Sequence, residues 1–374
     1  MSEFIQLHML TNYAPSNLNR DDLGRPKTAK MGGVDRLRIS SQSLKRAWRM
    51  SEFFNGLKGN RTKRVGLDWI YPLLVEKGVE EDVAKEWSTE IQLIFGEPED
   101  ASEDKPDHDL LNKQLVFISS EEKAALDYYC LEVVEFLKTG EDEEGFFNKL
   151  EKARKQKDKK KRHGALRKLM EDKVLSLVNL TVDIALFGRM LASSPKYNVE
   201  AAAQVAHAIT VNRVAVEDDY FTAVDDLNTH EEDAGSAHIG ESGFGSGVFY
   251  TYICINKTLL IDNLGSEEFA NSALKALIEA AATVAPSGKQ NSFASRARAL
   301  YIMAEKGSQQ PRQLSSAFLK PVDNADMVKV AIERLEKLRD NMDKAYGACA
   351  DKTKIMDVEK GEGSLTEILE FAGA

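Results

Sequence analysis

Hydrophobic and polar positions alternate over residues 3–10, which is the period-two pattern of a β-strand. The segment 11–39 that follows is broken by prolines and glycines and has no regular period. A loop of this length inside a compact domain is uncommon and usually carries function. A helix is predicted next, from about Ser41 to Phe54, because Ser40 and Ser41 are suitable N-cap residues ahead of an amphipathic pattern.

The middle of the chain is dominated by charged, helix-forming sequence. Residues 67–170 contain few strand signals and two amphipathic runs, at 121–138 and 143–170, so they predict an inserted helical lobe. Strand character returns over 174–190 and again over 205–216.

The last part of the chain mixes both kinds of element. Residues 217–247 are acidic and rich in glycine and histidine, which predicts a projecting loop or hairpin. A strand is expected at 247–260 and helices at 266–284 and 325–346. The order strand, helix, strand, strand, helix, strand predicts an α+β protein with a ferredoxin-like core and insertions.

Composition narrows the class of protein. Apolar residues make up 43% of the 374 residues and charged residues 29%, an ordinary soluble composition. No stretch approaches the roughly 18–20 apolar residues of a membrane helix, so no membrane partner is expected. Cys130, Cys254 and Cys349 lie far apart in no metal-ligand spacing, which is typical of free thiols in a reducing compartment. The cytoplasm is the expected location, and no metal or other cofactor is expected.

The net charge of −10 hides a segment of opposite sign. Residues 15–64 contain 13 basic residues against 4 acidic ones. A strongly positive stretch inside an acidic chain is typical of a local contact with a polyanion.

The predicted helix at 41–54 concentrates this charge. Gln42, Lys45, Arg46 and Arg49 are spaced i, i+3, i+4 and i+7, so they are expected to share one face. Like charges four residues apart repel each other unless an anion lies between them, and the nearby helix N-terminus favours anions as well. The pattern predicts a site for a phosphate backbone, the alternative being an ordinary solvated face.

Residues 16–49, SNLNRDDLGRPKTAKMGGVDRLRISSQSLKRAWR, resemble the signature of a known family. The segment is similar to that of the CasC-type backbone subunit of the type I-E CRISPR surveillance complex, Cascade. Further matches follow in the same order: VDIALFGRM, AHAIT, FTAVDDL, GSAHIG and SGVFYTYICIN. The resemblance covers most of residues 1–260.

The resemblance implies a hand-like protein: a palm with an RNA-recognition-motif-like fold, a helical finger lobe and a projecting thumb. The expected boundaries are 1–60 for the first part of the palm, 61–172 for the finger lobe, 173–216 for palm strands, 217–247 for the thumb and 248–374 for the rest of the palm.

The resemblance also implies a function without catalysis. Several copies would stack into a filament along one CRISPR RNA and display it for pairing with target DNA in antiviral defence, together with other Cascade subunits. The implied RNA contacts of the palm are Arg20, Lys27, Arg38, Ser40, Gln42, Lys45, Arg46 and Arg49. The implied wedges beside the bases are Met190 in the palm and Tyr220, Phe221, Val224 and Ile239 in the thumb.

The densest basic run, residues 152–168, lies in the predicted finger lobe. It lacks aromatic residues, so it cannot stack bases, but it could attract duplex DNA through release of counterions. Lys155, Lys159 and Lys160 are the candidate DNA contacts. A solvated helix is the alternative.

An enzymatic alternative rests on acidic residues. The predicted thumb carries carboxylates and histidines that could hold a divalent ion for phosphodiester cleavage, although their spacing is irregular. Asp21 and Asp22 lie in the basic loop, the kind of position from which related type III backbone subunits cleave RNA. A metal-dependent endoribonuclease with the same fold is therefore the second hypothesis. His8 and His207 lie among apolar residues and are predicted to be structural.

Overall fold

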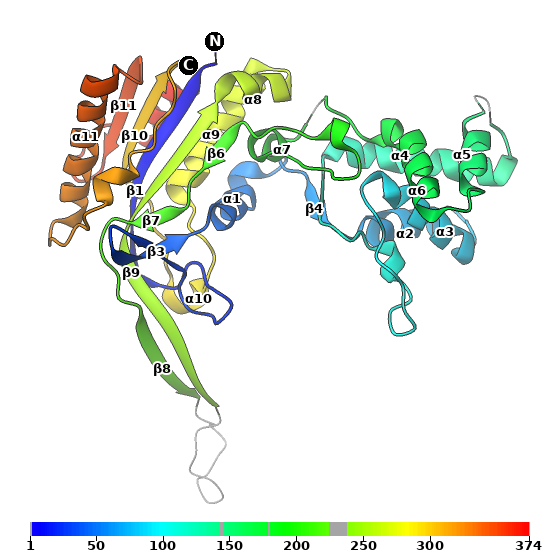
Figure 1. Ribbon diagram of the computed structural model, residues 1–374, viewed down its shortest axis with the longest axis horizontal. Coiled ribbons are helices and arrows are strands. Elements are labelled where there is room, and N and C mark those ends of the chain that lie inside the picture. The colour runs from blue at the N-terminus through cyan, green and yellow to red at the C-terminus, as the bar shows by residue number, and fades with distance from the viewer. Residues whose placement is uncertain (1, 143–144, 179, 224–237, 374) are drawn as a thin grey trace, which may run out of the picture. The chain divides into compact units, whose positions relative to one another are not determined.

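A computed structural model describes residues 2–142, 145–178, 180–223 and 238–373 (Figure 1). The chain forms two compact units. The sheet unit consists of residues 1–55, 203–259 and 267–374, and the helical unit consists of 56–202 and 260–266. Each unit is therefore assembled from segments that are distant in the sequence.

The sheet unit is built on a nine-stranded sheet (Figure 1). Every strand pairing described in this sheet is antiparallel. This is the mixed helix-and-strand architecture that the sequence predicted. In spatial order the strands are β11 (Lys352–Asp357), β10 (Ala299–Gly307), β1 (Phe4–Ser16), β9 (His238–Asn256), β7 (Ala208–Thr210), β3 (Val34–Ile39) and β2 (Thr28–Met31), with β6 (Ala203–Val205) and β8 (Glu217–Ala223) also pairing with β9.

Strand β1 is buried on both sides, although its alternating pattern also suits a half-buried strand. Ile5 and Leu7 on one face and His8 and Leu10 on the other are all fully buried. The face of Leu10 packs beneath helix α11 (Met327–Tyr346). Other helices of this unit are α1 (Ser41–Arg49), α9 (Glu267–Thr283) and α12 (Leu365–Gly373), and α9 packs against both α1 and α12.

The helical unit contains the two amphipathic runs at 121–138 and 143–170. The two amphipathic runs form helices around a core that includes Trp87, Leu126 and Leu150. Its helices are α2 (Tyr71–Glu76), α3 (Glu81–Ile91), α4 (Ser120–Thr139), α5 (Phe146–Arg154), α6 (Lys159–Val174) and α7 (Val182–Phe187), and β4 (Asn60–Thr62) pairs with β5 (Val116–Ile118). No helix in the described part of the chain is long and apolar enough to cross a membrane.

The strand prediction for 174–190 was wrong, because this segment contains helix α7 instead. A short apolar run does not distinguish a buried helix from a strand. Here Asp183 in the first turn accepts a hydrogen bond from the Gly59 backbone N–H at 2.9 Å, and Gly188 ends the helix with a φ of 77°. The Arg189 guanidinium then forms a fully buried ion pair with Glu122 at 2.6 Å, which anchors the chain after the helix.

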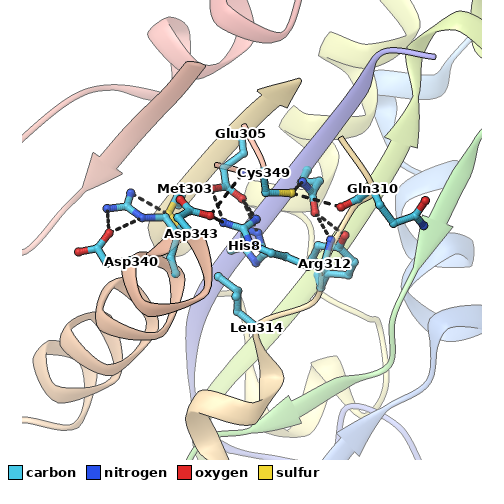
Figure 2. Close-up of polar contacts among 12 residues, drawn as sticks. His8, Met303, Glu305, Gln310, Arg312, Leu314, Asp340, Asp343 and Cys349 are labelled. Atoms are coloured by element: carbon cyan, nitrogen blue, oxygen red, sulfur yellow. Dashed lines mark hydrogen bonds and ion pairs between the residues drawn. The ribbon is translucent and has the colours of Figure 1, made fainter. Parts of the chain in front are cut away.

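A buried ionic network joins β1, β10 and α11 in the sheet unit (Figure 2). The Glu305 carboxylate accepts two hydrogen bonds from the Arg312 guanidinium, at 2.6 and 3.0 Å, and one from His8 Nε2 at 3.2 Å. The other His8 nitrogen accepts from the Tyr250 hydroxyl at 2.8 Å, and that hydroxyl accepts from the Leu314 N–H. His8 is therefore the structural histidine that the sequence predicted.

The charges of this network are fixed by their partners. Burial alone would raise the pKa of Glu305, but the hydrogen bonds from His8 and Arg312 lower it to about 2. Burial lowers the pKa of His8, so the imidazole is neutral at pH 7.

We expect Glu305→Gln to lower the free energy of unfolding by about 3 kcal/mol, because the buried Arg312 charge loses its main partner. The folded pKa of Glu305, about 2, lies below its ordinary value of 4.5. The contribution is therefore complete above pH 4.5 and is lost as the pH falls towards 2. Urea unfolding as a function of pH measures both effects.

The matched control is Glu367→Gln, because Glu367 forms an exposed pair with Lys354 at 2.6 Å in the same unit. This variant should lose less than about 1 kcal/mol. Equal losses in the two variants would show that the buried network does not stabilise the sheet unit.

Candidate nucleic-acid interface

The long loop between β1 and β2 is ordered by its own polar residues. Asn17 is fully buried, and its amide N–H groups donate to the carbonyls of Gly24, at 3.0 Å, and Gly243, at 2.8 Å. One side chain thus closes the loop and ties it to β9. Gly24 has a φ of 82°, a left-handed conformation that glycine adopts without strain.

Asp21 shapes the tip of the same loop. Its carboxylate accepts hydrogen bonds from the backbone N–H groups of Leu23, at 3.0 Å, and Arg25, at 2.9 Å. The Arg25 guanidinium in turn pairs with Asp218 of β8 at 2.8 Å. The structure thus gives Asp21 a role in the turn of the loop.

Asn19 connects this loop to the strands and helix that follow it. Its backbone carbonyl accepts from the Lys27 N–H at 2.8 Å, and its side-chain oxygen accepts from the Ser40 N–H at 2.9 Å. The Ser40 hydroxyl caps α1 by accepting from the Ser43 N–H at 3.3 Å, as the sequence predicted. Lys27, Ser40 and Arg20 are therefore held close to one residue.

The predicted basic face of α1 is only partly exposed. Gln42 and Arg46 are exposed and Lys45 is half-buried, so that burial lowers the pKa of Lys45. Arg49 is only 7% exposed, so it is less accessible than the other three residues of the predicted basic face. Arg49 follows the buried Trp48 in the last turn, where a cation is stabilised by the helix dipole.

Arg46 faces a cleft of about 610 Å³ in the sheet unit. Arg20 also lines this cleft, and in the described part of the chain neither guanidinium has an ion-pair or hydrogen-bond partner. A Cβ atom at Gly288 would lie 2.3 Å from the Leu18 carbonyl oxygen, so only glycine lets this wall approach the loop. The lining residues are Leu18, Asn19, Arg20, Asp21, Ser43, Arg46, Ala47, Met50, Ser51, Val284, Ala285, Ser287 and Gly288.

A second basic cluster lies on the β2–β3 hairpin and β7. The Arg38 backbone N–H donates to the Lys27 carbonyl at 2.8 Å, and Arg38 Nη1 donates to His207 Nδ1 at 3.0 Å. His207 is exposed, so the prediction that it is a structural histidine among apolar residues was wrong. Slight burial and the charges of Arg38 and Lys27 lower the pKa of His207. Only the pairing of β3 with β7 brings His207 to this cluster.

Not every basic residue of the segment is at the surface. Arg36 is fully buried, and its guanidinium donates to the backbone carbonyls of Thr210 at 3.0 Å, Val211 at 2.5 Å and Phe318 at 2.8 Å. Burial lowers the pKa of Arg36. This arginine therefore holds β3 to neighbouring backbone and is not available to a ligand.

The predicted thumb begins as a hairpin of β8 and β9 (Figure 1). Tyr220 is 65% exposed and Phe221 is 43% exposed. Phe221 lies opposite Gly240, where an added Cβ atom would come within 2.4 Å of the aromatic ring. Val224 lies outside the described residues, and of Ile239 only the backbone pairing with Thr222 is described.

The structure describes only some of the acidic residues on which the endoribonuclease hypothesis rests. Asp218 and Asp219 lie in β8 and are exposed, whereas the acidic stretch 225–233 lies outside the described residues. Within the described residues no group of three or more histidine, cysteine, aspartate or glutamate side chains is placed to hold a metal ion.

In the helical unit the basic run 152–168 contains both ion-paired arginines and exposed lysines. Arg154 pairs with Glu86, Glu90 and Glu151, and Arg167 pairs with Glu97. The candidate DNA contacts Lys155, Lys159 and Lys160 are all exposed.

Helix α6 begins at Lys159 with three successive lysines and no acidic residue in its first turn. A helix N-terminus normally favours negative charge, and here the N-cap residue Asp158 supplies it by accepting from the Lys161 N–H at 2.8 Å. Met190, in the same unit, is 80% exposed, as a residue that contacts another molecule must be.

Two solved structures similar to this chain come from the same kind of assembly. One chain, described as "CRISPR RNA-guided surveillance complex, pre-nicking", is 27% identical with a TM-score of 0.79, and the match covers 99% of this chain and all of that one. A second, described as "CRISPR RNA-guided surveillance complex", has 22% identity, a TM-score of 0.68 and 99% coverage of both chains, and shows the shared fold. No curated protein matches the sequence.

The resemblance to a surveillance-complex subunit that the sequence predicted is confirmed by these structures together with a family model. The model describes CT1975-like proteins and matches residues 5–371, almost the whole length of the protein. The chain therefore belongs to the family of CT1975-like proteins.

Proposed function

We propose that this protein is a non-catalytic, RNA-binding backbone subunit of a type I-E CRISPR surveillance complex. It polymerises along the guide RNA and displays that RNA for pairing with target DNA. The observation that carries the proposal is the cleft lined by both Arg20 and Arg46, which have no partners among the described residues. The match to a subunit of an RNA-guided complex supports it.

The chemistry of the cleft suits a phosphodiester. A guanidinium offers several N–H donors in a planar fork that matches phosphate oxygens, and two such groups can hold one bridging phosphate or two successive ones. Contacts to phosphate and sugar carry no base information, so a guide of any sequence can be held in this way. Asn19 contributes to the cleft and also holds Lys27 in place, which extends the basic surface from Arg20 to the β2–β3 hairpin.

In this proposal the sheet unit is the ferredoxin-like palm, the helical unit is the finger lobe and the β8–β9 hairpin is the thumb. Ser40, Gln42 and Lys45 would complete the palm contacts. Tyr220, Phe221 and Met190 would lie against bases, where stacking on one side chain contributes about 1–3 kcal/mol. The partners are the CRISPR RNA, further copies of the chain, other Cascade subunits and, through the RNA, target DNA.

The finger lysines are proposed to attract the DNA target. Lys155, Lys159 and Lys160 are exposed around the first turn of α6. Duplex DNA neutralised by such lysines releases its condensed counterions, which makes the contact favourable for any sequence.

Replacing Arg20 and Arg46 together by alanine should weaken binding of single-stranded RNA by a similar factor for every sequence tested. The plot of log affinity against log salt should become flatter by about 0.7 for each phosphate that the variant no longer binds. Filter binding at several salt concentrations measures both quantities, and electrophoresis of labelled RNA kept with Mg²⁺ or Mn²⁺ should show no cleavage product.

The control removes the same charge elsewhere in the sheet unit. Lys337 and Lys344 are exposed on α11, and Lys337→Ala with Lys344→Ala should leave both affinity and salt slope nearly unchanged. Equal effects of the two double variants would mean that net charge, and not the cleft, governs binding. RNA cleavage by the wild-type protein would favour the endoribonuclease hypothesis.

Replacing Lys155, Lys159 and Lys160 by alanine should leave RNA affinity unchanged and weaken the capture of duplex DNA by the RNA-loaded protein. For duplex DNA the salt slope should fall by about 0.9 for each phosphate that the variant no longer neutralises. Electrophoretic mobility shifts with each nucleic acid separate the two effects.

Three other exposed lysines of the helical unit, Lys77, Lys105 and Lys138, provide the matched control. Their replacement by alanine should affect neither ligand. Loss of RNA affinity in the Lys155, Lys159 and Lys160 variant would place the RNA, and not the DNA, on this surface.

A further inference from the structure

His207 is placed beside two cations by the pairing of strands. Arg38 lies opposite Ile209 in the β3–β7 pair, so His207, two residues before Ile209, is its diagonal neighbour on the same face. Lys27 meets Arg38 from the other side through the backbone hydrogen bond of 2.8 Å. Three groups that are or can become cationic therefore meet at one point of the sheet unit.

No acidic side chain balances this cluster in the part of the chain that the structure describes. The partner of the Arg38 guanidinium is His207 itself, at 3.0 Å, and the Lys27 ammonium has no side-chain partner there. The small cavity beside His207 is lined by neutral residues. Among them, Tyr250 of β9 is the titratable one, and its hydroxyl is engaged by His8 and Leu314. An anion from outside the chain would supply the missing negative charge.

In the protein without RNA, the hydrogen bond between Arg38 and His207 requires a neutral imidazole. Arginine can only donate, so His207 Nδ1 must present a lone pair to Arg38, and the proton of the neutral ring is on Nε2. That N–H is a further donor beside the two cations.

We propose that Lys27, Arg38 and His207 form one phosphate site, in which His207 binds an RNA phosphodiester as the doubly protonated imidazolium. The proposal rests on the proposed function, because it takes RNA as the source of the phosphate. The proposal adds His207 to the RNA contacts of the palm and couples RNA binding to the uptake of one proton.

A bound phosphodiester changes the balance of charge around His207. In the protein without RNA, slight burial and the charges of Arg38 and Lys27 hold the pKa of His207 below its ordinary value of 6.5. The negative phosphate reverses this effect and raises the pKa, so binding takes up a proton. The proton adds to Nδ1, which then no longer accepts from Arg38, and both groups donate to the phosphate instead. Affinity therefore rises as the pH falls through the pKa of the bound state, and it levels off below the pKa of the RNA-free state. Each unit between the two pKa values corresponds to a tenfold gain in affinity.

The test measures the affinity of the full chain for oligouridylate between about pH 5 and pH 8 at constant ionic strength, a range that spans the ordinary histidine pKa. The phosphodiester does not titrate in this range. Wild-type affinity should rise several-fold to about tenfold towards the acidic end. His207→Asn, which cannot titrate, should remove this rise and match the wild type near pH 8. His207→Lys, which is charged throughout, should bind tightly and without pH dependence.

The control is His108→Asn, because His108 is a partly exposed histidine of the helical unit that pairs with Glu99. This variant should keep the wild-type pH profile. If the wild type binds RNA without pH dependence, or if His207→Asn keeps the same rise, the proposed role of His207 is wrong while the RNA-binding function stands. If the wild type binds no RNA at any pH, the proposed function fails, and the phosphate site fails with it.

Discussion

The buried guanidinium of Arg36 determines how the edge of the sheet is built. A charge taken out of water must be stabilised by dipoles or by a counterion, and here backbone carbonyls provide the dipoles. Those carbonyls belong to Thr210, Val211 and Phe318, which come from two other parts of the chain. The β2–β3 hairpin, the end of β7 and the segment around Phe318 are thus tied to one side chain.

The surface cations depend on this arrangement. Lys27 and Arg38 belong to the same hairpin as Arg36, and His207 lies at the start of the strand whose other end Arg36 binds. The segment around Phe318 is held a second time, because the Leu314 N–H donates to the Tyr250 hydroxyl of the buried His8 network. The buried contacts of Arg36 and of the His8 network therefore position the segments that carry the exposed cations.

The sequence was sufficient to predict the local features and the family resemblance. It was not sufficient to predict which arginines are buried and which are exposed. The cap at Ser40 and the amphipathic pattern of α1 depend on residues within a few positions of each other, and both were predicted correctly. Arg36, Arg46 and Arg49 look equivalent in the sequence, yet only Arg46 is exposed, because packing with distant segments decides their burial. His207 was misjudged for the same reason, since its neighbour Arg38 is far away along the chain.

The hydrogen bonds of Asn17 and Asp21 lower the entropic cost of binding a ligand at the loop between β1 and β2. An unstructured loop of this length would lose on the order of 1–2 kcal/mol of conformational entropy per residue when it becomes ordered around a ligand. In this protein the loop loses that entropy when the chain folds, because the two side chains fix its backbone from within. An anion that arrives at Arg20 meets a cation on a backbone already in place, so more of the contact energy is retained as affinity.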